Sequence, residues 1–370
     1  MKKILFLTAF PPNKNTGGGK NTLGILDLLS ASHDVDLIYW QAAKDDEVTL
    51  DNRNIQVKNV FTLTKTKKIF NVLTLIIINR FFSIRFSLFD LFKLKGMVSE
   101  EKYDLIIFDH SQIFLYGWFL DRSISKAFIA LDIITQRVSR SIKYIFPIHT
   151  FISEYIILKA PGVNLFTLNK KDVDLTWRWF GKRMDVINVP IDRYIRELPR
   201  SNNIDRNFNM FGNWKRLDNI SGLKWLISDV LEHVKEPLKI DVYGIMEEFT
   251  DSIIVNKVEV HFHGFIENPY DAIASSRGMI VPLFTGAGVK IKVIESLACG
   301  CPVIGTDIAF EGVPVDNDKF ILKANSKEDF IRVLNDCSEL DISLQEREIF
   351  KRNFLNSYMS GIEHLVDGNR

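Results

Sequence analysis

Cysteine is scarce in this chain of 370 residues, in which only three occur, at positions 299, 301 and 337. An odd, sparse set of this kind does not form a disulfide framework, which excludes the class of small disulfide-rich secreted domains. A reducing compartment fits this usage. We interpret Cys299 and Cys301 as packing residues between a helix and a strand, because no further metal ligands accompany them in the sequence.

Long hydrophobic runs are also lacking. The most apolar stretch, residues 72–78, is far shorter than the roughly 20 residues that a membrane-spanning helix needs. Two lysines precede an apolar run at residues 4–7, as in a secretory signal, but two prolines soon follow and no small-residue cleavage site does. We therefore expect residues 4–7 to be the first strand of a cytoplasmic protein without a transmembrane segment.

Neither sign of charge dominates, since 47 Lys and Arg against 46 Asp and Glu leave a net charge of +1. This balance gives no reason to expect a nucleic-acid partner. With 46% hydrophobic and 25% charged residues, the composition is that of an ordinary globular protein, and the length predicts two domains or three.

What the sequence does contain is a repeated alternation of short apolar runs and helix-length segments. The runs of the first cycle are residues 4–7, 35–39, 105–108, 128–131, 165–168 and 186–189. After a polar interval at residues 199–207, a second cycle has runs at 208–211, 238–243, 258–262, 278–281, 302–305 and 320–322. Continuous apolar strands that alternate with helices predict parallel sheets covered by helices.

The fold class is therefore predicted to be α/β, with two Rossmann-like domains that face each other across a cleft. We expect the first domain to span residues 1–200 and the second to span residues 201–342. Residues 343–370 have a helical pattern and could pack back on the first domain.

The strongest chemical signal is the segment 281–307, in which a strand is followed by a turn containing Gly286 and Gly288 and then by a helix. Glycines let a backbone approach a ligand closely, and a helix start attracts anions, so this turn is a candidate phosphate cradle. Lys290 and Lys292 project about 200 degrees apart on a helix, so only one can face the ligand. We favour Lys290, which is nearer the turn. Taken alone, the glycines would equally fit an ordinary helix start with solvated lysines.

Glu295 follows Lys290 by five residues and should lie near the same ligand, about one and a half turns deeper along the helix. A carboxylate there suits the vicinal hydroxyl groups of a sugar or a ribose better than it suits a phosphate.

The whole segment 281–307 resembles the carboxyl-terminal signature of GT-B glycosyltransferases of the family 4 type, also called glycosyl transferases group 1. Further landmarks follow in the family's order along nearly the whole chain: Phe6-Leu7-Thr8, Pro11-Pro12, Gly17-Gly18-Gly19, Val189-Pro190-Ile191-Asp192, Phe211-Gly212-Asn213 and Phe262-His263-Gly264-Phe265-Ile266.

The resemblance implies a GT-B fold with an acceptor-side domain first and a donor domain second. It implies donor contacts from Gly212, Asn213, Lys215, Gly264, Phe265, Ile266, Thr285, Gly286, Ala287, Gly288, Val289, Lys290 and Glu295, of which Lys290 and Glu295 are also counted as catalytic. It further implies that a loop of Gly17, Gly18 and Gly19 closes over the substrates and excludes water.

The sequence departs from the family pattern at two places. The family's second glutamate, eight positions before Glu295, is replaced by Ala287, and its arginine and Lys-Gly pair after the first donor-domain strand is not evident. The chain resembles a subgroup with a Gly-Ala-Gly-Val-Lys loop, in which backbone amides and Lys290 take over the donor contacts. The resemblance implies a retaining reaction, but with Ala287 the retaining and inverting outcomes both stay open.

Two polar residues end strands of the first domain, His110 after residues 105–108 and Asp132 after residues 128–131. Open α/β sheets bind ligands at the carboxyl ends of their strands, so both are candidates for the acceptor side, with His110 as a catalytic residue and local hydrogen bonding as the alternative. Three Asp-x-Asp triplets, at 34–36, 172–174 and 316–318, read as solvated turns. We therefore expect no metal site and no essential metal cofactor.

Residues 65–95 are locally basic, with seven Lys or Arg against Asp90 alone, and carry six phenylalanines. Basic heads on apolar stems suit the surface of an anionic bilayer, which predicts peripheral attachment to the inner face of the cell membrane. The alternative is that the apolar residues are core and the lysines form a solvated face.

Together these features predict an enzyme that transfers a sugar from a nucleotide diphosphate sugar, its co-substrate, to a glycan or lipid-linked acceptor in surface polysaccharide assembly. Backbone amides and a lysine would stabilise the leaving group without a metal. Two alternatives stay open: a GT-B nucleotide-sugar epimerase, and a non-catalytic subunit that binds a nucleotide sugar or scaffolds a partner.

Overall fold

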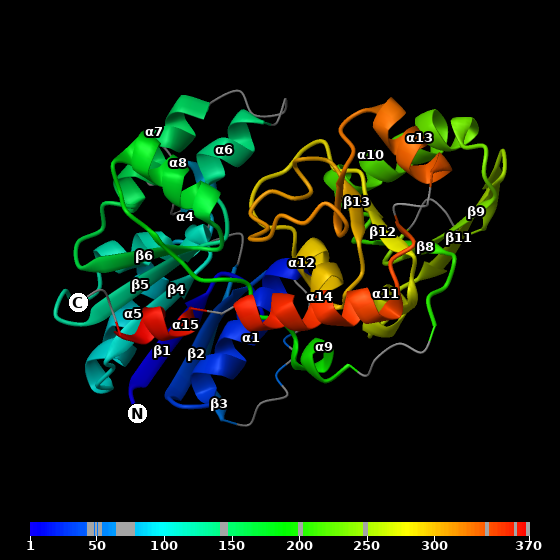
Figure 1. The fold of residues 1–370 in the computed structure, drawn as a ribbon. Helices are drawn as coiled ribbons and strands as arrows, with labels where there is room; N and C mark the ends of the chain where they lie inside the picture. Colours follow the sequence, from blue (N-terminus) through cyan, green and yellow to red (C-terminus); the bar gives the residue numbers. More distant parts are fainter. Residues whose placement is uncertain are drawn as a thin grey trace. The chain divides into compact units, whose positions relative to one another are not determined.

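The structure is a computed structural model, and it describes residues 1–42, 48, 50, 54–63, 78–140, 147–198, 203–246, 251–336, 340–358 and 361–367 (Figure 1). The chain divides into two compact units. Unit 1 consists of Met1–Pro190 and Ser360–Arg370, and unit 2 consists of Ile191–Met359.

The described part of unit 1 contains one sheet of seven parallel strands. They are β1 (Lys3–Thr8), β2 (Asp34–Gln41), β3 (Ile55–Thr62), β4 (Leu105–Asp109), β5 (Ser125–Ala130), β6 (Val163–Thr167) and β7 (Asp185–Val186). Their order is β3-β2-β1-β4-β5-β6-β7, which reverses direction between β1 and β4. Open parallel sheets bind ligands at the carboxyl ends of the strands beside such a reversal.

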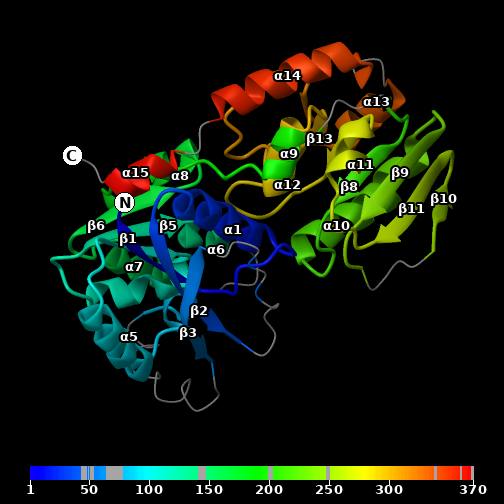
Figure 2. The same cartoon turned by 90° about the horizontal axis from the view of Figure 1, so that it is seen from below.

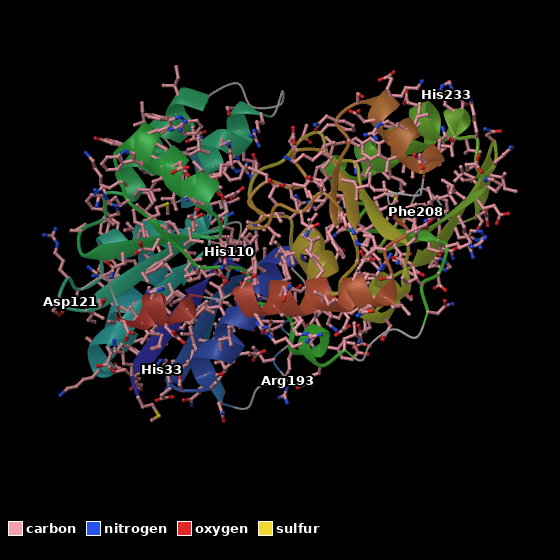
Figure 3. All side chains as sticks on the ribbon, in the orientation of Figure 1. His33, His110, Asp121, Arg193, Phe208 and His233 are labelled. Atoms are coloured by element: carbon pink, nitrogen blue, oxygen red, sulfur yellow. The ribbon has the colours of Figure 1, made fainter. Side chains whose placement is uncertain are left out.

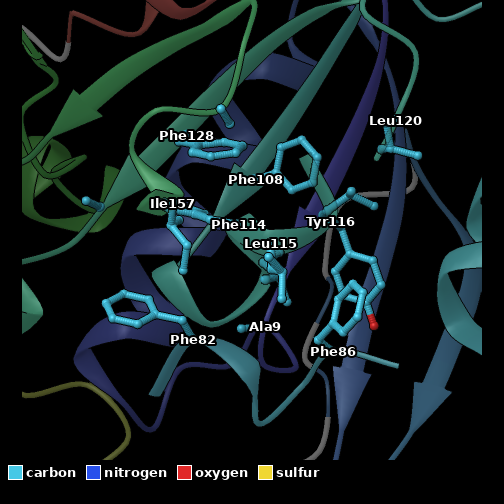
Figure 4. Packing of buried hydrophobic residues seen from close by; sticks show 14 of the residues in the cluster. Ala9, Phe82, Phe86, Phe108, Phe114, Leu115, Tyr116, Leu120, Phe128 and Ile157 are labelled. Carbon is cyan, nitrogen blue, oxygen red and sulfur yellow. The ribbon is translucent and has the colours of Figure 1, made fainter. Parts of the chain in front are cut away.

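Helices and helical turns connect these strands. They are α1 (Gly17–Ser30), α4 (Arg80–Ser83), α5 (Leu88–Glu100), η1 (Ser111–Trp118), α6 (Ile134–Ser139), α7 (Pro147–Ile157), α8 (Lys170–Phe180) and α15 (Ile362–Asp367). An aromatic core anchors η1 against the sheet: the rings of Phe114 and Phe128 stack at 4.2 Å, and Phe108 meets Phe128 edge to face at 5.0 Å (Figure 4). This packing fixes the turn that leaves β4.

Within the residues that the structure describes, unit 2 also has seven strands: β8 (Phe208–Phe211), β9 (Leu238–Tyr243), β10 (Ile253–Val255), β11 (Val258–Gly264), β12 (Gly278–Val281), β13 (Val303–Gly305) and β14 (Ile321–Lys323). Their order is β10-β11-β9-β8-β12-β13-β14, and β10 alone among them runs antiparallel. Without β10 the parallel strands follow the same order as the first six of unit 1. The reversal lies between β8 and β12.

Helices cover both faces of the sheet of unit 2 (Figure 1, Figure 2). One face packs against α9 (Arg193–Glu197), α11 (Tyr270–Ser275), α12 (Ile291–Ala298) and α14 (Leu344–Ser357). The other packs against α10 (Leu217–Trp225), its continuation through η2 (Leu226–Val230) and η3 (Leu231–His233), and α13 (Lys327–Asn335). Two α/β sheets of Rossmann-like order, one parallel throughout its described strands and one parallel except for β10, confirm the predicted fold class.

The observed division of the chain differs from the predicted one at both points where the chain passes between the units, after Pro190 and after Met359. The segment from Ile191 to α9 belongs to unit 2 and not to a first domain ending at residue 200, because Ile191 and Ile195 are buried in the core of unit 2. The predicted third segment, residues 343–370, is divided. Its long helix α14 packs on α12 through Phe350 and Phe354, whereas the short α15 lies against α1 in unit 1.

One contact fixes α10 close to the end of β12. A Cβ atom on Gly222, in the interior of α10, would lie 2.0 Å from the carbonyl oxygen of Pro282. A Cβ atom on Gly96, in the interior of α5, would meet nothing within 4 Å. Both glycines are helical, but a Cβ atom has room at Gly96 and none at Gly222.

We predict opposite effects of alanine at these two glycines. Gly96→Ala should stabilise the protein by about 0.5 to 1 kcal/mol, because alanine loses less backbone entropy in a helix. Gly222→Ala should destabilise it by about 1 to 3 kcal/mol, because α10 must move off the strand end. Urea unfolding of each variant measures both. Equal stabilisation by the two substitutions would contradict the close packing of α10.

Candidate active site

Three neighbouring strands of unit 2 end in the same way, with an aromatic ring followed by glycine: Phe211-Gly212 on β8, Tyr243-Gly244 on β9 and His263-Gly264 on β11. The Phe211 and Tyr243 rings stack at 4.8 Å, and the Tyr243 and His263 rings stack at 4.7 Å. The stacked rings thus lie across the three strand ends, and His263 lies at a bulge in the pairing of β11 with β9.

The glycines bring backbone against backbone at this edge. A Cβ atom on Gly244 would lie only 1.8 Å from the carbonyl oxygen of Gly212, and the Gly244 amide donates to the Gly264 carbonyl at 2.7 Å. Gly212 and Gly264 are predicted site residues, whereas Gly244 is not. The repeated aromatic-glycine pair at three strand ends was the sequence signal that could have found it.

The predicted cradle lies directly after β12. Gly286 and Gly288 have φ values of 118° and 72°, conformations that favour glycine, and they carry the chain from the strand to α12. Thr285 is exposed, Gly286, Ala287 and Val289 are partly buried, and Gly288 is buried. The helix begins at Ile291 with Lys290 as its N-cap residue, so its positive end points toward this loop.

A second helix start lies beside the first. The contact between Gly222 and Pro282 places α10 against β12, and Asp218, in the first turn of α10, has its Oδ2 3.9 Å from the position of a Cβ atom on Gly286. Arg216 precedes this turn and forms two hydrogen bonds with Asp218, of 2.7 and 3.1 Å. Two helix N-termini therefore meet at the carboxyl edge between β8 and β12, which favours an anion there.

The lysine at this edge is Lys292, not Lys290 as we expect from the sequence. The Lys292 ammonium donates to the Phe211 carbonyl at 3.1 Å and to Asn219 Oδ1 at 3.0 Å. The Lys290 ammonium turns back to the carbonyl of Gly288 at 2.6 Å. The two lysines do point apart, but α12 starts after Lys290, so that Lys292 faces β8.

Burial lowers the pKa of Lys292 to about 8, with Asp218 opposing the effect and Arg216 adding to it. Lys290, by contrast, lies 4.0 Å from Glu311 Oε2, and both of these side chains are only 11% exposed. Lys292 is thus the more easily deprotonated of the two lysines, and the Lys290 ammonium lies against its own loop and near a carboxylate.

The remaining predicted donor residues surround the same edge or its continuation. Glu295, one turn into α12, accepts a hydrogen bond of 2.8 Å from the hydroxyl of Tyr270. Asn213 follows Gly212 and accepts from the backbone amide of Lys215 through its side chain at 3.1 Å. Phe265 is 57% exposed after β11, and Ile266 packs partly against the core.

In unit 1, His110 stands at the carboxyl end of β4, next to the reversal of strand order (Figure 3). Its φ of 75° is unusual for a residue other than glycine, and its Nδ1 lies 3.0 Å from Oδ2 of the fully buried Asp109. Thr22 of α1 and Thr8 of β1 donate to the same carboxylate oxygen. Sequence reasoning missed Asp109, although it directly precedes His110.

The three glycines predicted as a loop are instead the first turn of α1. Thr16 caps this helix by accepting from the Gly19 amide at 3.1 Å. A Cβ atom on Gly18 would lie 3.1 Å from His110 Nε2, so the helix start and the imidazole share one site in unit 1. Gly17 is exposed and Gly19 is buried under the backbone of Asn13.

Asp132 is held locally, because Arg137 Nε donates to its carboxylate at 2.6 Å. Close by, the buried Glu154 accepts the amides of Ile134 and Thr135 at 2.8 Å each, and burial raises its pKa to about 7. Asp132 therefore forms a local hydrogen bond with α6, as in the alternative to an acceptor-side role.

In the part of the chain that the structure describes, no three His, Cys, Asp or Glu side chains come together as metal ligands would. Cys299 and Cys301 are free and buried, and burial raises the pKa of both thiols. Cys337 lies outside the described residues, as do residues 65–77 of the basic stretch 65–95. Among the described helices, none has the length and apolar character to cross a bilayer.

Residues 206–339 match the family described as Glycosyl transferases group 1. No protein among the curated sequences matches the chain.

Solved structures of similar fold cover almost the whole chain. HepE (Alr3699) of Anabaena, in complex with UDP, is 13% identical over 99% of this chain and 97% of its own, with a TM-score of 0.65. A TarM mutant of S. aureus, in complex with fondaparinux, alpha-GlcNAc-glycerol and UDP, is 11% identical over 99% and 98%, with a TM-score of 0.67. WaaG, a glycosyltransferase involved in lipopolysaccharide biosynthesis, is 11% identical over 99% and 100%, with a TM-score of 0.60.

The matched residues 206–339 span the three glycine-ended strands, the cradle and both helix starts of unit 2. The chain thus has the GT-B fold, and residues 206–339 of its second unit match the glycosyl transferases group 1 family.

Proposed function

We propose that this protein transfers a sugar from a UDP-sugar to a hydroxyl group of a glycan or lipid-linked acceptor. The observation that carries the proposal is the meeting of two helix N-termini and Lys292 at one strand edge of unit 2. A diphosphate suits this edge, because backbone amides, helix dipoles and an ammonium group all favour a compact anion. UDP as the nucleotide is supported by its presence in the HepE and TarM structures.

In this reaction the bond between the anomeric carbon and the diphosphate oxygen breaks, and the acceptor oxygen forms the new bond and loses its proton. Negative charge grows on the departing UDP, where the amides of the cradle and Lys292 can stabilise it. Glu295 is suited to hydroxyl groups of the donor. Retention of the anomeric configuration is part of the proposal, on the resemblance of the segment 281–307 to retaining enzymes.

Unit 1 would supply the acceptor side. Asp109 Oδ2 lies 3.0 Å from Nδ1 of His110, and Nε2 of the same ring lies beside the start of α1. An imidazole in this place can hold a hydroxyl group of a substrate. The acceptor class, a surface glycan or its lipid-linked precursor, is supported by the role that WaaG has in lipopolysaccharide biosynthesis.

The function is tested by product analysis with UDP-, GDP-, dTDP- and CMP-sugars, each first alone and then with glycan and lipid-linked acceptors. We expect UDP and a glycosylated acceptor, formed only when both substrates are present. The anomeric proton coupling of the product reports retention or inversion. An isomerised donor without acceptor would instead identify an epimerase, and donor binding without any product would identify a non-catalytic subunit.

The same assay in excess chelator serves as its control for metal dependence. We propose that activity persists, because the helix starts and Lys292 supply the positive field that a metal supplies elsewhere. Activity that is lost in chelator and restored by magnesium or manganese would contradict this.

Lys292→Met should weaken UDP binding by about 1.5 to 3 kcal/mol and uridine binding far less, because the lost contact is charge-assisted to phosphate. The matched control, Lys290→Met, should have the smaller effect. Calorimetry with both ligands measures this. Equal losses for UDP and uridine would remove Lys292 from the phosphate site.

The lowered pKa of Lys292 adds a pH dependence to the same experiment. As pH rises through about 8, the free protein loses the Lys292 proton and must regain it to pair with the diphosphate, so UDP affinity should fall. Lys292→Arg stays charged throughout and should abolish the fall. A decline that persists in Lys292→Arg would assign it to another group.

We also propose peripheral attachment to an anionic membrane surface through the basic stretch 65–95. Within its described part, α5 exposes Phe89 at 69% and Phe92 at 70%, next to the exposed Lys93 and Lys95. Aromatic rings beside lysines suit a headgroup layer, where rings are buried and charges remain hydrated.

Liposome binding should therefore require anionic lipid and weaken as salt rises, since each basic residue near such a surface contributes about 1 kcal/mol. Phe89→Ser combined with Phe92→Ser should reduce it. Ile254→Ser, at a residue of unit 2 that is 75% exposed, is the control and should leave it unchanged. Failure of the wild-type protein to bind anionic liposomes at low salt would overturn the proposal and favour a soluble acceptor.

A further inference from the structure

Tyr270, the first residue of α11, connects two carboxylates in unit 2. Its side chain is 4% exposed and belongs to the core beneath α12. The hydroxyl lies 2.8 Å from Oε1 of Glu295 and 3.4 Å from Oδ2 of Asp192. Neither contact could be expected from the sequence, in which the three residues are far apart.

A single hydroxyl carries one proton and cannot donate fully to both carboxylates. Burial raises the pKa of Tyr270 well above its usual range, with Glu295 and Asp192 adding to the effect, so the proton stays on the tyrosine. The shorter contact makes Glu295 the present acceptor. One oxygen of Glu295 is thereby held from the core side, which fixes the plane of the carboxylate on α12.

Asp192 lies close to the point where the chain passes from unit 1 to unit 2. It is the second residue after the crossing from Pro190 to Ile191, and it caps α9 by accepting the Tyr194 amide at 2.8 Å. The Tyr194 ring stacks on that of Tyr270 at 6.1 Å, and its hydroxyl donates to Asp271 at 2.8 Å. The first residues of unit 2 thus contact α11 through Asp192 and Tyr194, at Tyr270 and at Asp271.

We propose that Tyr270 is a positioning residue that orients Glu295 toward hydroxyl groups of the donor, and that Asp192 is the competing acceptor for its proton. A shift of Asp192 toward Tyr270 would weaken the hydrogen bond from Tyr270 to Glu295, and a shift away would strengthen it. The inference rests on the proposed function, because it concerns how a donor is held.

The test compares three probes by calorimetry: pyrophosphate, which has no hydroxyl group, UDP and UDP-glucose. Tyr270→Phe should weaken the binding of UDP, UDP-glucose or both by about tenfold and leave pyrophosphate binding unchanged, because the phosphate contacts are separate from Glu295. A purely structural role would weaken all three. Tyr194→Phe, which removes the neighbouring hydroxyl that bonds to Asp271, is the matched control and should change none of them.

Dependence on Glu295 is read from a double-mutant cycle. In the Glu295→Gln background, Tyr270→Phe should cause little further loss. Glu295→Asp, which shortens the side chain but keeps its charge, should reproduce the Tyr270→Phe loss and serves as a second route if Tyr270→Phe does not fold. Asp192→Asn keeps the helix cap and removes the competing charge, so affinity should stay equal or rise.

Full additivity of Tyr270→Phe and Glu295→Gln, or an Asp192→Asn loss as large as that of Tyr270→Phe, would overturn the inference. These outcomes leave transfer by the wild-type protein intact, so they do not touch the proposed function. If the wild-type protein binds neither UDP nor any nucleotide sugar, the proposed function fails and the role of Tyr270 fails with it.

Discussion

Close approach of backbone to backbone is the constraint on which the candidate site of unit 2 depends. Gly244 lies against the Gly212 carbonyl, and Gly222 lies against the Pro282 carbonyl, at separations that leave no room for a side chain. The first contact narrows the edge formed by the ends of β8, β9 and β11, and the second brings the start of α10 beside the start of α12. Without these contacts the helix termini would not converge, and their partial positive charges would be dispersed along the edge.

The charges around this edge are nearly balanced within the protein. Arg216 pairs with Asp218, and Lys290 lies near Glu311. Lys292 donates hydrogen bonds to a backbone carbonyl and to a side-chain amide oxygen. A cluster of cations without such partners would repel itself in the absence of ligand. Because Lys292 donates hydrogen bonds to neutral partners, whereas Arg216 and Lys290 lie beside carboxylates, the proposed diphosphate would not have to detach the Lys292 ammonium from an acid.

Much of the fold and part of the site could be predicted from the sequence, and the failures share a cause. Continuous apolar runs identified the parallel strands, and Gly286 and Gly288 identified the turn between β12 and α12. Which of Lys290 and Lys292 faces β8 depends on the residue at which α12 begins, which spacing alone does not give. The cap from Thr16 makes Gly17, Gly18 and Gly19 the first turn of a helix and not a loop. Asp109, Tyr270 and Asp192 matter through contacts between distant segments, which spacing along one chain does not show.

The sheet edges have a consequence for behaviour at high protein concentration. Among the described strands, β7 has two residues and β10 and β14 have three each, so three of the four sheet edges offer another chain almost no ladder to extend. The fourth edge, β3, has eight residues, but its pairing with β2 skips Lys58 in a bulge. Short, bulged and lysine-bearing edges resist strand addition, so self-association through the sheets is disfavoured even where many copies gather on one surface.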